Sequence, residues 1–196
     1  MFTVRDSKLI NFLEDELSRD EAYKLITSYP EILPFVGNNR YLLIKDFSFK
    51  DVSSHIALFV RRNNKILPYL LDFSLYAYGD LIDEEYYPPA EALWDVGLMS
   101  DELDWMIKNL GYEIKRSRSK YAKELKEKLR NVLKLKRLEF GETELVYIVN
   151  DITEDFKSFI DLMNEEHETY ISGLALRKYI EPSSNYTVYI LLRYPE

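Results

Sequence analysis

The side chains most able to do chemistry are concentrated in one basic segment, residues 115–137. This segment holds eleven Lys and Arg against two Glu, a local charge of +9, whereas the whole chain of 196 residues carries −8 and the remainder therefore −17. Cationic groups at helical spacing can contact successive phosphates, and Arg can bind one phosphate through two parallel hydrogen bonds. The segment therefore predicts a polyanion-binding surface for DNA or RNA. The predicted contact residues are Arg116, Arg118, Lys120, Lys123, Arg130, Lys134 and Arg137.

The same charges also fit a non-enzymatic assembly or interaction protein. Overall acidity discourages nonspecific binding to polyanions, while a local positive stripe still acts at short range, because salt screens charges beyond about 8–10 Å. The basic segment could instead be neutralised by the acidic remainder of its own fold, by an acidic protein partner or by another subunit of a homo-oligomer. Ion-pair networks of this kind are frequent in proteins from thermophiles. The sequence leaves this alternative open.

A second candidate for chemistry is the stretch Tyr-Glu-Ile-Lys-Arg at residues 112–116, which we predict to be a short strand. On a strand, Glu113 and Lys115 would point to the same face, because side chains alternate with a period of two. The carboxylate could hold a divalent metal such as Mg²⁺, and the ammonium could stabilise charge that develops on an attacked phosphate. These residues predict, as an alternative function, a metal-dependent phosphodiesterase.

The spacing Glu113-Ile114-Lys115, followed by a helix and another strand, resembles the catalytic strand of the PD-(D/E)xK nuclease superfamily. The resemblance covers only these three residues and the order of elements through residue 149. It implies catalytic roles for Glu113 and Lys115, and it implies an Asp at the start of the preceding strand. Here a whole helical region separates the preceding strand from this stretch, and the chain contains no Pro-Asp pair. The candidates for that Asp are Asp72, Asp80 and Asp83.

Asp80 and Asp83 belong to an acidic stretch, residues 79–85, which contains two further Glu. Carboxylates of this kind could bind Mg²⁺ or Ca²⁺, and together with Glu113 they are the predicted metal ligands. The stretch lacks the ligand spacing and the central Gly of an EF-hand loop, so a solvated loop is the competing interpretation.

Composition and missing motifs exclude several kinds of site. The chain has no Cys, which excludes disulfides, thiolate zinc sites and Cys nucleophiles. It also lacks a P-loop, a G-x-G-x-x-G fingerprint, an H-E-x-x-H motif and a G-x-S-x-G elbow. Its two histidines, His55 and His167, lie far apart in the sequence without metal-ligand spacing.

The composition also predicts where the protein works. The absence of Cys and Gln beside 31% charged residues is typical of thermophiles, which predicts an archaeon or one of its viruses as the source. The N-terminus shows no apolar signal-peptide core, and the longest apolar runs are too short to span a bilayer. We therefore expect an intracellular, cytoplasmic protein that does not act in a membrane.

The elements that must position the candidate residues follow from hydrophobic periodicity and capping residues. The basic helix is expected to be capped by Ser117 or Ser119 and stopped by Gly141, while Pro68 places its strand at an edge or delays its start. The segment 168–185 stays unassigned. Helices are expected over residues 7–17, 18–29, 101–110, 117–138 and 151–166. Strands are expected over residues 40–47, 55–61, 66–78, 112–116, 144–150 and 185–194.

This order of elements predicts an α/β or α+β fold with one mixed β-sheet and flanking helices. An N-terminal helical pair is followed by an antiparallel meander and then by a β-α-β-α-β arrangement, which favours parallel pairing. We expect one globular domain over residues 1–196, within which residues 1–30 could form a helical subunit.

Overall fold

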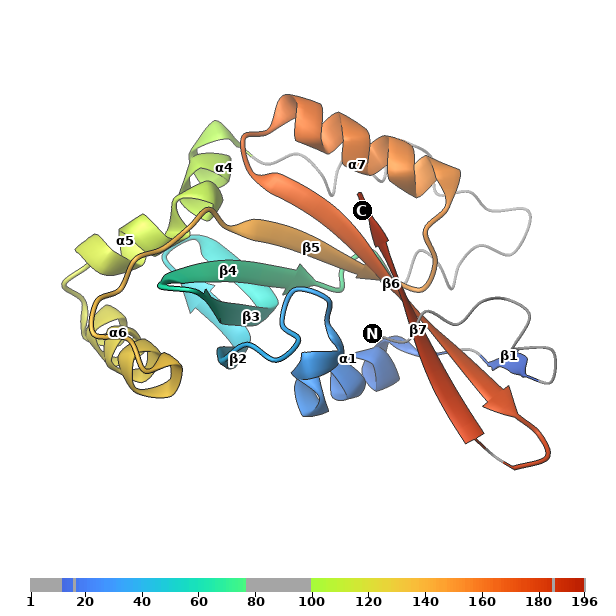
Figure 1. The fold of residues 1–196 in the computed structure, drawn as a ribbon. Helices are drawn as coiled ribbons and strands as arrows, with labels where there is room; N and C mark the ends of the chain where they lie inside the picture. The colour runs from blue at the N-terminus through green and yellow to red at the C-terminus, as the bar shows by residue number, and fades with distance from the viewer. Residues whose placement is uncertain (1–11, 16, 77–99, 185, 196) are drawn as a thin grey trace.

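The strands form one curled, mixed sheet in the computed structural model, which describes residues 12–15, 17–76, 100–184 and 186–195 (Figure 1). The strand order is β1-β6-β5-β4-β3-β2, and β7 pairs with β6 along its other side. The strands are β1 (Leu13–Asp15), β2 (Tyr41–Phe49), β3 (Val52–Arg62), β4 (Lys65–Asp72), β5 (Glu144–Val149), β6 (Tyr170–Glu181) and β7 (Tyr186–Tyr194). The helices are α1 (Arg19–Ser28), η2 (Pro30–Ile32), α4 (Asp101–Lys108), α5 (Leu110–Arg116), α6 (Lys120–Leu133) and α7 (Glu154–Glu166).

The sheet combines the two expected kinds of pairing. β2, β3 and β4 form an antiparallel meander, whereas β4, β5 and β6 pair in parallel. Two helical connections make this parallel pairing, because α4, α5 and α6 link β4 to β5 and α7 links β5 to β6. The last pair, β6 with β7, is again antiparallel. The prediction of a mixed α/β sheet with flanking helices is therefore confirmed.

Two apolar layers cover opposite faces of the sheet. One layer packs α4, α5, α6 and α7 on the strands and contains Leu125, Leu129 and Phe159. The other layer packs α1 and the turn after it on the strands and contains Ile26 and Phe35. Because neighbouring side chains on a strand point to opposite faces, the apolar runs of β3 and β5 supply both layers.

Several local predictions are confirmed by hydrogen bonds. The hydroxyl of Ser18 accepts from the backbone N–H of Glu21 at 3.3 Å, and the Ser18 N–H donates to the Glu21 carboxylate at 3.0 Å. This capping box begins α1 as expected. Pro68, by contrast, lies inside β4 rather than at its start. It is tolerated because it falls between the Ile66–Phe140 bridge and residue 69, where continuous pairing with β5 begins.

Three element predictions are wrong or incomplete. The helix expected over 7–17 is a strand at Leu13–Asp15, since β1 pairs there with β6, and residues 7–11 lie outside the described part of the chain. The strand expected over 112–116 is helix α5. The unassigned segment 168–185 contains β6, the strand that joins β1, β5 and β7.

Helix α5 forms because its buried residues follow helical spacing. Leu110, Glu113 and Ile114 are buried at intervals of three and four residues. Gly111 lies within α5. A Cβ atom at Gly111 would come within 2.2 Å of the Phe140 side chain, so the absence of a side chain permits close packing of α5.

None of the helices in the described ranges is long and apolar enough to cross a membrane.

Candidate functional site

The basic helix α6 forms where the sequence predicts an amphipathic helix, but with tighter bounds than 117–138. Ser119 caps it, because its hydroxyl accepts from the Ala122 N–H at 3.1 Å. It ends at Leu133, and Lys134 follows in the left-handed conformation with φ 53°. The predicted stop at Gly141 is therefore wrong. The buried side of the helix consists of Ala122, Leu125, Leu129 and Leu133.

Two cations fix the position of α6 through backbone carbonyls. Arg61 of β3 donates from Nη1 to the carbonyl oxygens of Leu133 at 3.0 Å and Lys134 at 3.3 Å. These carbonyls lie at the C-terminal end of the helix, where a positive charge is favourable. Lys126 of α6 donates from Nζ to the Ser117 carbonyl at 2.8 Å, which holds the end of α5 against α6.

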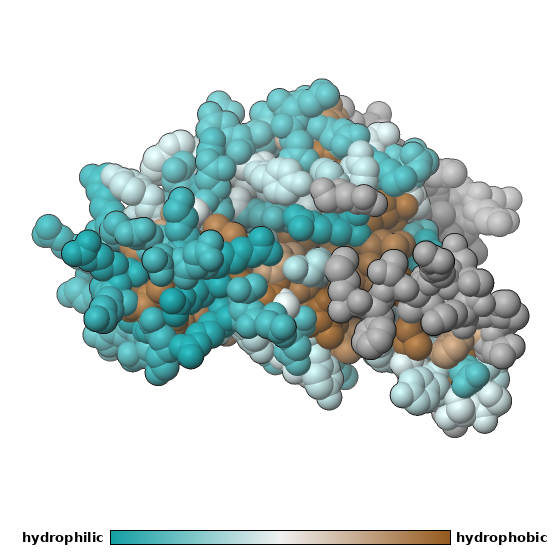
Figure 2. Space-filling view, viewed as in Figure 1, coloured by the Kyte–Doolittle hydropathy of each residue, from teal (hydrophilic) through white to brown (hydrophobic). Residues whose placement is uncertain are grey.

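The predicted contact residues are exposed on and around this anchored helix. We call these seven residues the basic surface. Figure 2 shows hydrophilic residues over the edge of the molecule where α5 and α6 lie in Figure 1. Lys123 and Arg130 lie on the same flank of α6 as Lys126, since these positions are separated by three and four residues. The members of the basic surface are Arg116, Arg118, Lys120, Lys123, Arg130, Lys134 and Arg137, and all are exposed.

The basic surface forms no ion pair with the carboxylates that the structure describes. No ion pair within the described ranges includes any cation of residues 115–137. The carboxylates that do form ion pairs contact other cations, namely Lys50, Lys108, Lys157, Arg177, Lys178 and Arg193. Internal neutralisation, the competing interpretation of the basic segment, therefore finds no support among the described residues.

The N-terminal end of α6 has the charge pattern opposite to that of other helices. α1, α4 and α7 each carry two or more acidic residues in the first turn, whereas α6 carries none. Its first turn contains Lys120 and Lys123 instead. Because the N-terminus of a helix is already positive, these lysines oppose helix stability and increase the attraction for an external anion.

The apolar face of α6 is narrower than its sequence indicates. Tyr121 and Val132 are also apolar residues of this helix, but their exposed fractions are 42% and 44%. Both lie on the flank opposite Lys123 and Arg130, and the Tyr121 ring lies 6.3 Å from that of Phe49. Burial raises the pKa of the Tyr121 phenol, which therefore stays neutral at physiological pH.

The structure does not support the expected geometry of Glu113 and Lys115. Side chains two residues apart on a helix are separated by about 200° around its axis, so Glu113 and Lys115 leave α5 in different directions. Glu113 is buried and forms an ion pair with Lys50 in the turn between β2 and β3, whereas Lys115 is exposed. The strand face that carries the resemblance to the nuclease superfamily is therefore absent at residues 112–116.

The third expected catalytic residue, Asp72, has partners of its own at the end of β4. Its Oδ1 lies 3.6 Å from His55 Nδ1 and accepts from the Ser74 N–H at 2.6 Å. Within the described part of the chain, no hydrogen bond or ion pair joins it to Glu113 or Lys115.

Of the three predicted metal ligands, the structure describes only Glu113. Asp80 and Asp83 lie outside the described residues. Over residues 12–15, 17–76, 100–184 and 186–195, no three His, Asp or Glu side chains are grouped so that they could hold a metal ion. Glu113 in particular is engaged with Lys50.

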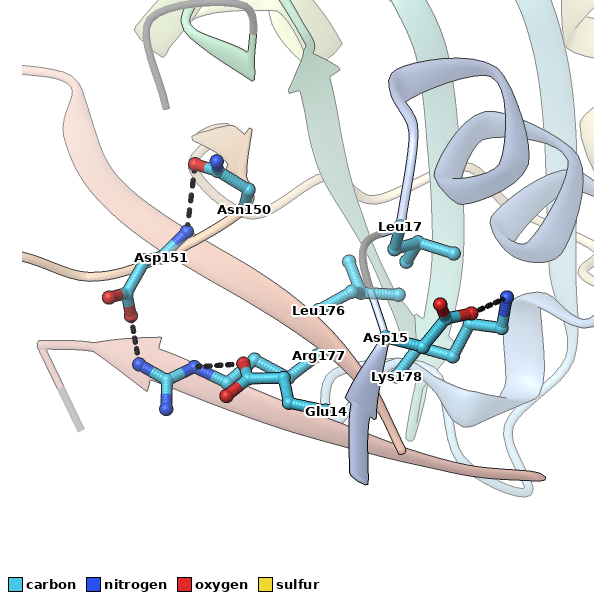
Figure 3. A pocket seen from close by; sticks show the side chains of 8 residues that line it. All are labelled: Glu14, Asp15, Leu17, Asn150, Asp151, Leu176, Arg177 and Lys178. Carbon is cyan, nitrogen blue, oxygen red and sulfur yellow. Dashed lines mark hydrogen bonds and ion pairs between the residues drawn. The ribbon is translucent and has the colours of Figure 1, made fainter. Parts of the chain in front are cut away.

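A charged pocket that the sequence analysis missed lies beside β6, with a volume of about 280 Å³ (Figure 3). Residues from three separate segments of the chain line this pocket, so no local sequence motif predicts it. The only sequence signal is the pair of polar residues after the apolar strand β5, a position where α/β proteins often place functional groups. Its lining residues are Glu14, Asp15, Leu17, Asn150, Asp151, Leu176, Arg177 and Lys178.

The charges of this pocket are paired with one another. The Arg177 guanidinium lies between Asp151, with which it forms a hydrogen bond, and Glu14 at 3.9 Å (Figure 3). Lys178 lies 2.5 Å from Asp15. The hydrogen bond to Asp151 raises the pKa of Arg177, and the one to Asp15 raises the pKa of Lys178. Since each cation already contacts a carboxylate, the pocket is poorly suited to bind an external polyanion.

Comparison with known proteins adds no further assignment: no protein-family model, no curated protein and no solved structure matches this chain.

Proposed function

We propose that the protein binds nucleic acid through the basic surface. The observation that carries this proposal is that seven exposed cations are gathered around one anchored helix and form no ion pair with a described carboxylate. Lys and Arg that neutralise phosphates release the counterions condensed on a nucleic acid, which favours binding. Phosphates also accept bidentate hydrogen bonds from Arg.

The binding mode follows from how the cations are held. α6 presents its basic flank as a rigid row, since its opposite side is buried in the apolar layer and its C-terminal end is held by Arg61. Contacts from such a row reach phosphates rather than base edges, so we expect little sequence preference. If about six phosphates are contacted, the logarithm of affinity should fall with the logarithm of salt concentration at a slope of about −5.

An exposed tyrosine favours single-stranded nucleic acid as the ligand. The Tyr112 side chain is 53% exposed and lies on the exposed side of α5 with Lys115 and Arg116. An aromatic ring beside phosphate-binding cations can stack on an unpaired base, which is worth about 1–3 kcal/mol per base. We expect Tyr112→Ala to weaken binding to single strands more than binding to duplex. Tyr29→Ala, at an exposed tyrosine that follows α1, is the control.

The test is a charge reversal on one flank with a matched control on the other sheet face. Lys123→Glu with Arg130→Glu should reduce affinity for labelled single-stranded DNA or RNA at least about 100-fold at low salt, because two phosphate contacts become repulsive. The control is Lys24→Glu with Lys45→Glu, which changes the net charge equally at two exposed lysines of α1 and β2. Lys45 lies over the Tyr23 ring, against the layer opposite α6.

Each outcome of this experiment decides a separate point. Loss of binding in the α6 variant alone supports the basic surface. Equal loss in both variants would show that net charge, not this surface, controls binding. Undiminished binding by a folded α6 variant would refute the proposal. Circular dichroism and thermal unfolding of both variants establish that they are folded.

A further inference from the structure

One edge of the sheet, the outer side of strand β7, is unpaired in the described part of the chain. β7 is nine residues long and pairs only with β6 among the strands that the structure describes. In Figure 1 the β6–β7 ribbon projects from the body of the sheet. Along β7 the exposed fractions reach 69% at Tyr186, 39% at Tyr189 and 37% at Leu192. Apolar and aromatic side chains therefore accompany a row of backbone groups that pair with no other strand in the described part of the chain.

The opposite edge of the same sheet, strand β2, is protected against pairing with another strand, whereas β7 is not. β2 carries the exposed charged residues Lys45 and Asp46. Asp46 has φ 48°, and the pairing of β2 with β3 passes from Lys45 to Phe47 without including Asp46. α6 also packs beside this strand, with Leu42 and Ile44 against its apolar layer. Charge, an irregular residue and a covering helix are common protections of a sheet edge, and β7 shows none of them over Tyr186–Leu192.

We propose that β7 pairs with β7 of a second copy of this chain, antiparallel, about a two-fold axis at Ile190. This is the one antiparallel self-pairing that uses all nine residues of the strand. Each residue then faces a suitable partner of the second copy. The pairs are Tyr186 with Tyr194, Thr187 with Arg193, Val188 with Leu192, and Tyr189 with Leu191.

The charge pattern of β7 is compatible with this pairing. Arg193 is the only charged residue of the strand, and in the self-pairing it lies opposite Thr187, so no two like charges meet. Within its own chain Arg193 donates to Glu144 at 2.6 Å, which already offsets its charge. Two-fold symmetry doubles every favourable pair and closes the assembly at two copies rather than producing a fibre.

The backbone supplies most of the interaction. Adding a strand to an open sheet edge forms a ladder of main-chain hydrogen bonds, while the side chains set the register. The contact is a single strand pair with limited buried area, so the dimer should dissociate on dilution. This inference is independent of the proposed nucleic-acid binding, since α6 lies beside β2 at the far side of the sheet.

The test uses one exposed position with two opposite charges. Thr187→Lys places a second cation opposite Arg193 of the other copy, whereas Thr187→Glu places an anion there. Both substitutions are at an exposed residue, so the monomer tolerates either. Analytical ultracentrifugation over a dilution series should show a reversible dimer for the wild type. The dimer constants of the two variants should differ by about tenfold in favour of Thr187→Glu, because symmetry repeats each contact.

Two results would overturn the proposal. A wild-type protein that stays monomeric at every concentration would show that β7 does not pair with itself. A dimer whose dissociation constant is the same in Thr187→Lys and Thr187→Glu would show that the copies meet elsewhere. Repeating the measurement at high salt should reduce the difference between the two variants, since exposed charges are screened.

Discussion

The basic surface around α6 and the charged pocket beside β6 contain the same kinds of cation in opposite situations. In the pocket, Arg177 and Lys178 each contact carboxylates from other segments of the chain. On the basic surface, seven exposed cations contact no described carboxylate. A paired charge holds segments together, whereas a group of unpaired like charges opposes folding slightly. The difference fits a structural role for the pocket, and it is the reason why we propose a ligand-binding role for the basic surface.

Burial explains why the two regions should respond differently to substitution. The Arg177 side chain is 31% exposed, and the β1, β5 and β6 segments meet around it. Ion pairs in such a position are less screened than exposed ones, and removing one partner leaves a carboxylate partly desolvated. Exposed cations without a partner have no such interaction to lose.

The largest expected effect lies at the carboxylate with the most complete set of partners, Asp104 of α4. Burial alone would raise its pKa, but hydrogen bonds from Thr169 and from the Glu168 and Thr169 amides outweigh this and lower it. The folded-state pKa therefore lies below the unfolded value of 3.8. Its contribution is present above that value and is lost as pH falls through the folded pKa.

Asp104→Asn tests this expectation. It should lower the free energy of unfolding at pH 7 by about 2–3 kcal/mol, because the buried amides lose their charged acceptor. Urea titrations from pH 7 to pH 3 should show a smaller acid-induced loss in the variant than in the wild type. Equal acid sensitivity of the two proteins would contradict the assignment.

The next effect compares one arginine from each region. Arg177→Ala should lower the free energy of unfolding by about 1–2 kcal/mol, since Asp151 and Glu14 lose their partner. Arg130→Ala should change it by less than about 0.5 kcal/mol, because no described carboxylate contacts Arg130. Chemical denaturation measures both. Binding assays should give the reverse order, with nucleic-acid affinity reduced by Arg130→Ala only.

The smallest expected effect is an increase in stability rather than a loss. Lys120→Glu should stabilise the protein by about 0.5 kcal/mol, because an anion at the N-terminal end of α6 complements the helix dipole. The same change should weaken nucleic-acid binding. Thermal unfolding measures the change in stability, and a salt-dependent binding titration measures the change in affinity. A variant that is less stable than the wild type and binds equally well would contradict the contrast drawn between the two regions.

Local sequence was sufficient wherever neighbouring residues decide the structure. The capping box of Ser18 and Glu21 begins α1, and the strands β2, β3, β5 and β7 lie where short apolar and aromatic runs predict them. Helix α6 was predictable because its buried apolar residues, Ala122, Leu125, Leu129 and Leu133, recur every three and four residues. These features depend on hydrogen bonds and periodicity within about ten residues of chain.

Predictions failed where distant segments decide. Residues 112–116 form a helix because Glu113 meets Lys50 and because Gly111 lies against Phe140, contacts that no local pattern contains. β6 was missed because its twelve residues mix apolar, small and charged side chains, and its identity as a strand depends on three partners. The pocket escaped notice for the same reason, since its carboxylates and cations come from separate segments.

The sequence by itself determined that a strongly cationic, amphipathic helix lies within residues 117–138 and that the remainder of the chain is acidic, while the bounds 120–133 come from the structure. Only the tertiary structure decided which of those acids meet which cations. Charges on one chain attract over short distances only, so the pairing depends on where the strands place each carboxylate. β1, β5 and β6 bring acids to Arg177 and Lys178, whereas the described carboxylates leave the cations of α6 free.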